Sequence, residues 1–163
     1  MRTAVKGMLL FLALTAGGCA PAGPPFGSIA ATLPPVPAGE ARIYVYRWLE
    51  PYESVAETEA FLNGNPVGVT ETGTVFYRDV APGQYTISVH SDGVFPDQFK
   101  TVILKPGDVA YARIESIKSW APCGSSGGRS GGATEGCEDT FVVVMIDPAL
   151  AQADMRDLRY IHG

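Results

Sequence analysis

Positive charge and histidine are scarce in this sequence. Its 163 residues include 12 lysines and arginines against 17 acidic residues, and the formal net charge is −5. Such a surface repels phosphate backbones, and the cations form no basic stripe, so we expect no nucleic-acid partner. The only histidines, His90 and His162, are expected to be solvated surface groups. Phosphate-loop and zinc signatures are absent, and we expect no metal site and no cofactor.

Long apolar runs are also missing. The run from Met8 to Leu14 is much shorter than the ~20 residues that a membrane span needs. Arg2 and Lys6 precede it and small residues follow it, which is the pattern of a secretion signal over residues 1–18. A membrane anchor that stays in place is the alternative, but the run is too short for it.

The residues from Leu14 to Cys19 (LTAGGC) resemble the lipobox of bacterial lipoproteins. The resemblance implies cleavage after Gly18 and a lipid on Cys19, although Ala16 stands where that family usually has Leu. The alternative is an ordinary secreted protein with an incidental Cys19. In Gram-negative lipoproteins an Asp after the cysteine favours retention in the inner membrane, so Ala20 in this resemblance implies the outer membrane, with the domain facing the periplasm.

A segment rich in Pro, Gly and Ala follows the cysteine. Residues 20–39 carry no charge and show no periodicity. This composition predicts that residues 19–40 form a lipidated, semi-extended tether reaching at most about 60 Å. The folded domain is then expected over residues 41–160.

From Glu40 onward the sequence consists of short β-type runs separated by turn signals. Alternation is strict in residues 84–90, and Asn63-Gly64 is a strong tight-turn dipeptide. The fold class we predict is all-β: an antiparallel β-sandwich of the immunoglobulin or transthyretin type. The runs expected to form strands are residues 42–48, 57–62, 67–70, 74–80, 84–90, 99–104, 109–117 and 140–146.

A short C-terminal helix is expected after the last strand. Asp147 fits an N-cap and Pro148 the first helical position. Ala151, Met155 and Leu158 share one face of a helix from 148 to about 160, and this face should pack on the sandwich.

Four stretches in order carry a family resemblance: residues 41–47 (ARIYVYR), 61–68 (FLNGNPVG), 80–86 (VAPGQYT) and 105–111 (KPGDVAY). The chain resembles small bacterial lipoproteins of the domain of unknown function 2846 family, and its middle part is similar to PEGA-type surface modules. The resemblance implies a β-fold and an envelope location, but no reaction. The Gly/Ser-rich stretch 120–138 departs from a minimal family member.

Cys123 and Cys137 bracket that Gly/Ser-rich stretch. In an oxidising envelope the two are expected to form a disulfide, worth ~3 kcal/mol for a loop of about 15 residues. A metal pair or a redox pair is the competing interpretation, and the sequence gives neither any support. The strands on either side, 109–118 and 140–146, should be neighbours.

Tyr44, Tyr46 and Trp48 are spaced two apart and therefore share one face of a strand. With Tyr77 they are a possible aromatic platform for a sugar. The competing interpretation, which we favour, is that this face belongs to the core or packs on the C-terminal helix.

The sequence names no catalytic residue, and we expect no enzyme. The leading hypothesis is a non-catalytic envelope lipoprotein acting as a structural or protein-interaction module, attached to the membrane by its lipid. A module that binds cell-wall glycan or another surface ligand is second, and a small hydrolase is third. Partners would accordingly be the membrane and either envelope proteins or cell-wall glycan.

Overall fold

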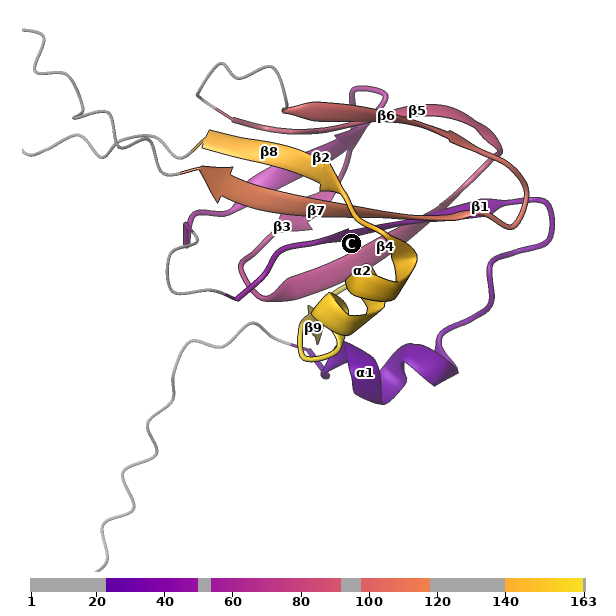
Figure 1. The fold of residues 1–163 in the computed structure, drawn as a ribbon, viewed down its shortest axis with the longest axis horizontal. Helices are drawn as coiled ribbons and strands as arrows, with labels where there is room; N and C mark the ends of the chain where they lie inside the picture. The colour runs from indigo at the N-terminus through magenta and orange to yellow at the C-terminus, as the bar shows by residue number, and fades with distance from the viewer. Residues whose placement is uncertain (1–22, 50–53, 92–97, 118–139, 163) are drawn as a thin grey trace, which may run out of the picture.

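The computed structural model describes residues 23–49, 54–91, 98–117 and 140–162 (Figure 1). About half of these residues lie in strands, and the chain also forms two short helices and one helical turn. The elements in chain order are α1 (Phe26–Ile29), η1 (Ala30–Thr32), β1 (Ala41–Tyr46), β2 (Thr58–Leu62), β3 (Asn65–Thr70), β4 (Thr74–Val80), β5 (Gly83–Val89), β6 (Phe99–Leu104), β7 (Val109–Ile117), β8 (Thr140–Met145), α2 (Pro148–Met155) and β9 (Arg159–Tyr160).

The strands form two sheets that share one apolar core. One sheet has five strands in the order β8-β7-β1-β4-β9, and the other has four in the order β3-β2-β5-β6. Val45 and Phe76 reach the core from the first sheet, and Leu62 and Ile87 reach it from the second. The predicted all-β class is confirmed, and the arrangement is sandwich-like.

Two strand pairings are parallel, so the prediction of a wholly antiparallel fold is wrong there. β1 pairs with β7 in parallel, and β4 pairs in parallel with the two-residue β9. β7 enters its sheet from β6, which belongs to the other sheet. Its direction is therefore set by a crossing between sheets, whereas a tight hairpin would have forced an antiparallel pair.

The Asn-Gly turn lies where the sequence predicts it, between β2 and β3. Asn63 and Gly64 have φ of 51° and 78°, the left-handed values that make this dipeptide suit a tight hairpin. The Asn63 side chain also ties the turn to β5. Its Oδ1 accepts from the Thr86 amide at 2.8 Å, and its Nδ2 donates to the Gln84 carbonyl at 3.3 Å.

The predicted pairing of the last two long strands is confirmed. β7 and β8 are antiparallel neighbours from Ala112↔Met145 to Ile117↔Thr140. The stretch between them, including Cys123 and Cys137, lies outside the described residues. The disulfide therefore stays a prediction.

The C-terminal helix begins as predicted but is shorter. Asp147 Oδ1 accepts from the Ala149 amide at 2.9 Å, and Pro148 occupies the first turn. α2 ends at Met155, so the prediction of a helix to about residue 160 is wrong. The chain turns back because the Arg159 amide bonds to the Gly73 carbonyl at 2.8 Å and β9 adds to the edge of β4.

The apolar helix face that the sequence identifies is buried. Ala151, Met155 and Leu158 are each at most 5% exposed. Across the described ranges, no helix is long and apolar enough to cross a membrane.

The segment before β1 corrects the prediction of a tether. Phe26 is 6% exposed, in a cluster with residues of the five-stranded sheet and α2. Its amide donates to the Leu158 carbonyl at 2.7 Å, and the Gly27 amide donates to the Arg156 carbonyl at 2.8 Å. Residues 23–35 are therefore part of the folded domain, because Phe26, paired backbone groups and the hydrogen bonds from Arg42 to the carbonyls of Pro34 and Pro35 hold them there.

Candidate functional site

Three tyrosines lie side by side across the outer face of the five-stranded sheet. Tyr44 on β1 is in register with Tyr77 on β4 and with Tyr111 on β7. The Tyr44 ring stacks on that of Tyr111, with centroids 5.4 Å apart and planes within 5°, and lies 5.6 Å from that of Tyr77. Residues in register on neighbouring strands point to the same face, so the pairing of β1 with both neighbours makes this row.

Both helical segments cover this face. α1 and α2 lie on the same side of the five-stranded sheet, with β9 between them (Figure 1). Phe26 of α1 and Met155 of α2 belong to the same buried cluster as Tyr44 and Tyr111.

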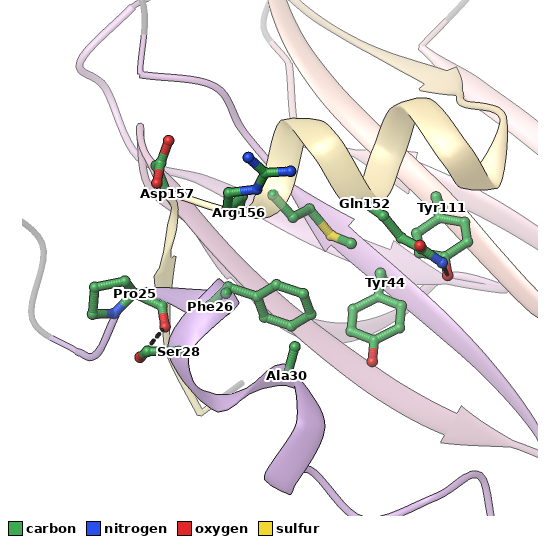
Figure 2. Close-up of a pocket in the computed structure, with 11 residues that line it drawn as sticks. Pro25, Phe26, Ser28, Ala30, Tyr44, Tyr111, Gln152, Arg156 and Asp157 are labelled. Atoms are coloured by element: carbon green, nitrogen blue, oxygen red, sulfur yellow. Dashed lines mark hydrogen bonds between the residues drawn. The ribbon is translucent and has the colours of Figure 1, made fainter.

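A hollow of about 560 Å³ opens between α1, α2 and the tyrosine row (Figure 2). Phe26, Tyr44 and Tyr111 line its aromatic part, and the Phe26 ring lies beside Tyr44 in the gap between the two helices. Its polar lining residues are Ser28, Gln152, Arg156 and Asp157.

Hydrogen bonds and burial set the chemistry of the hollow. Gln152 Nε2 donates to the Tyr111 hydroxyl at 3.4 Å, which holds the amide over the ring row. Burial raises the pKa of the Tyr44 phenol, while hydrogen bonding and charge from Arg42 act against that rise. Tyr44 is therefore a neutral hydroxyl at physiological pH and offers hydrogen bonding without charge.

Arg42 fastens the edge of this face. Its guanidinium forms a two-point ion pair with Asp79, Nε to Oδ1 at 2.6 Å and Nη2 to Oδ2 at 2.9 Å. It also lies 3.8 Å from the Tyr77 ring centroid and donates to the Pro34 carbonyl at 2.9 Å. The hydrogen bond to Asp79 raises the pKa of Arg42, so the cation is permanent and holds residues 34–35 against β1.

A second polar cluster lies beneath α2, around Asp154. The Tyr46 hydroxyl donates to Asp154 Oδ2 at 2.8 Å, and Arg113 Nη1 donates to the same oxygen at 3.2 Å. Arg113 also pairs with Glu115, and its guanidinium lies 3.6 Å from the Trp48 ring centroid. Burial first, and then Asp154, raise the pKa of Tyr46. The cluster fastens α2 to β1 and β7.

Arg47 is a fully buried cation that the sequence analysis did not single out. Its side chain is 0% exposed and donates to the carbonyls of Ser54 at 2.6 Å, Ala56 at 2.7 Å and Thr70 at 3.2 Å. The guanidinium also lies 4.8 Å from the Phe141 ring centroid. Arg47 therefore holds in place the residues that lead into β2. An arginine next to a strand gives no sequence signal of this role, because two of the carbonyls belong to the irregular stretch before β2 and the third to the last residue of β3.

The structure places the residues of the possible platform under the helices. Tyr44 and Tyr46 are 8% and 1% exposed, and Trp48 packs beside them against Arg113. Tyr44 borders the hollow described above, and Trp48 borders a smaller one with Leu49 and Asp154. The shared strand face is thus mainly a packing surface that meets solvent only at the edges of two hollows.

The remaining sites fall into two groups. Cys19, Cys123 and Cys137 lie outside the described residues, and so does the signal. His90 and His162 are exposed, and the His162 ring meets the Tyr160 ring edge-on at 5.2 Å. Among the residues that the structure describes, no three His, Cys, Asp or Glu side chains group in a way that could hold a metal ion.

Fold and site together define a small two-sheet β-domain with one helix-covered face and an aromatic hollow. The sequence profile of the family described as a protein of unknown function (DUF2846) matches residues 37–129, more than half of the chain, and the protein belongs to this family. No curated protein matches it.

The residues that line the hollow lie partly inside and partly outside the region that matches the family. Tyr44 and Tyr111 lie inside the matched residues, whereas the lining residues from α1 and from the end of α2 lie outside them. The four-stranded sheet lies entirely within the match.

Proposed function

We propose that this protein is a non-catalytic envelope lipoprotein whose domain, an immunoglobulin- or transthyretin-like sandwich, acts as a protein-interaction module. The signal and lipobox support attachment through a lipid on Cys19. The exposed apolar side chains on the outer face of the four-stranded sheet are the observation that supports a protein-interaction role.

That face carries several solvent-exposed apolar side chains. Phe99 and Ile103 on β6 are 54% and 72% exposed, and Val69 on β3 is 43% exposed. Phe61 on β2 extends the face, because Phe61, Ser88 and Phe99 are register partners across three strands. In Figure 1, α1 and α2 lie away from this sheet, so no described helix covers it.

The polar positions of the same face are mostly uncharged. Thr101 pairs with Thr86, and Gln84 pairs with Ile103, so hydroxyl and amide groups separate the apolar side chains. Glu59, opposite Val69, is the acidic member. Exposed apolar side chains clustered on one face and interleaved with polar ones are typical of a protein contact surface.

A photo-crosslinking amino acid at Ile103 tests this proposal in intact cells. We expect a discrete protein adduct that excess purified wild-type domain suppresses and excess Ile103→Glu domain does not. Leu150 on α2, which is 63% exposed, is the matched control position. Equal adducts at Ile103 and Leu150, or equal suppression by both competitors, would contradict the proposed face.

Lipid attachment has its own test. Metabolic labelling with a fatty-acid analogue should mark the wild-type chain, and the mark should disappear in a Cys19→Ala variant. A variant that still labels and fractionates with membranes would contradict attachment at Cys19.

The hollow supports a second candidate, binding of a cell-wall glycan or another small surface ligand. Its volume of about 560 Å³ lies within the usual range of small-molecule sites, and it combines aromatic and hydrogen-bonding groups. Cell-wall sugar fragments titrated against the soluble domain should perturb the Tyr44 and Tyr111 ring signals in nuclear magnetic resonance spectra. A Gln152→Ala variant should weaken that response. Unchanged ring signals would remove this candidate.

A further inference from the structure

The chain packs closely against the domain only a few residues after the lipobox. The Tyr160 amide donates to the Pro24 carbonyl at 2.9 Å, and Pro25 forms a bridge with Arg159. Gly23 has φ of 132°, and a Cβ there would lie 2.2 Å from the Tyr160 carbonyl oxygen. This position therefore accepts glycine only, and the close contact begins at Gly23.

The attachment continues through α1 and beyond. Phe26 is buried against Tyr44, and a Cβ on Gly27 would lie 2.9 Å from the Arg156 carbonyl oxygen. Arg42 holds the Pro34 carbonyl at the far end of the segment. Residues 23–34 therefore cannot lengthen the connection to a membrane without giving up these contacts.

The remaining connection is very short. Four Cα–Cα steps separate Cys19 from Gly23, and a fully extended chain covers at most about 14 Å over that distance. A flexible tether of residues 19–40 would have allowed a distance between lipid and domain several times longer.

From this geometry we propose that the domain is held directly against the membrane, with the surface formed by α1, η1 and β9 facing the lipid headgroups. The inference rests on the proposed lipid at Cys19. It adds the orientation: β5 and β6 lie on the opposite side of the molecule from α1 and therefore point away from the bilayer (Figure 1).

The chemistry of the membrane-facing surface agrees with a lipid partner. Exposed residues of α1 and η1 are small and uncharged: Gly27, Ser28, Ala30, Ala31 and Thr32. Arg156, next to Asp157, and Arg159 add two cations to this side of a chain whose net charge is −5. The surface nearest the lipid thus lacks the acidic excess that anionic headgroups would repel.

Photo-crosslinking to metabolically labelled phospholipid tests the orientation in the full-length protein. A crosslinking amino acid at Ala31 should give a lipid adduct several-fold stronger than the same group at Ile103. A Gly/Ser linker of about 20 residues inserted between Ala22 and Gly23 leaves the lipobox and docked segment intact and should abolish that difference.

The outcomes separate the two levels of the proposal. A chain that takes up fatty acid but gives equal adducts at Ala31 and Ile103, or keeps the Ala31 adduct with the linker, overturns the orientation alone. A chain that takes up no fatty acid overturns both the orientation and the lipoprotein assignment.

Discussion

The ring of Phe26 meets the ring of Tyr44 edge-on, with centroids 5.7 Å apart and planes at 82°. Aromatic pairs of this geometry contribute about 0.5–1.5 kcal/mol beyond the burial of their surface. The contact joins the uncharged N-terminal segment to the first strand of the sheet. It also closes one side of the hollow.

Replacing Phe26 with alanine should release that segment. Truncation of a buried phenylalanine costs about 3 kcal/mol or more, so the free energy of unfolding of the soluble domain should fall by about that amount. Urea denaturation measures it, with Ile103→Ala as a matched exposed control that should change it by less than about 0.5 kcal/mol. Equal effects of the two substitutions would show that Phe26 is not docked in solution.

Arg47→Lys should destabilise the domain although it keeps the charge. A lysine lacks the planar fork that lets one side chain reach the carbonyls of Ser54, Ala56 and Thr70. Lost hydrogen bonds to a buried charged group cost about 2–3 kcal/mol in the free energy of unfolding.

Arg156→Lys, at an exposed arginine, is the control for Arg47→Lys and should be nearly neutral. Matching denaturation midpoints for the two variants would argue against the role given to Arg47.

Local patterns in the sequence were sufficient for the parts of the fold that neighbouring residues determine. Asn63-Gly64 makes its turn and Asp147-Pro148 starts its helix, because both depend on backbone preferences within a few residues. The parallel pairing of β1 with β7 depends instead on a crossing between sheets, about which strand alternation carries no information.

The docked N-terminal segment also could not be predicted from local sequence patterns. Pro, Gly and Ala in residues 23–34 predict an extended chain, and one buried phenylalanine with a few backbone hydrogen bonds overrides that preference. Only part of the tyrosine row could be predicted from the sequence. The spacing of Tyr44 and Tyr46 gives their common face, whereas the alignment of Tyr44 with Tyr77 and Tyr111 needs the register of three strands.

Stability should fall as the pH rises above about 10, and Tyr46 should contribute to that fall. The pKa of Tyr46 in the folded state is raised above its ordinary value of 10.0, first by burial and then by Asp154. The unfolded chain therefore loses this proton at a lower pH than the folded one, so the stabilisation is complete below pH 10 and is lost at higher pH. Denaturation midpoints from pH 8 to above pH 11 measure the effect.

A Tyr46→Phe variant should show a shallower decline with pH than the wild type. Tyr85→Phe, which removes a phenol bonded to the Ala81 carbonyl, controls for the loss of a hydrogen-bonded hydroxyl elsewhere in the domain. Identical slopes for the wild type and Tyr46→Phe would contradict the assignment to Tyr46.

The predicted Cys123–Cys137 bond can be tested against the strand pairing around it. Ile117 and Thr140 are register partners at the end of the β7–β8 ladder, six residues before Cys123 and three after Cys137. A bond between the two cysteines would close a loop of about 15 residues. It would restrict the unfolded chain and thereby raise the free energy of unfolding by ~3 kcal/mol. Reduction should therefore lower the melting temperature by several degrees without changing the circular dichroism spectrum of the fold. Non-reducing mass spectrometry of protein taken from the envelope should find the two cysteines linked in one peptide pair, and two unmodified thiols there would rule the bond out.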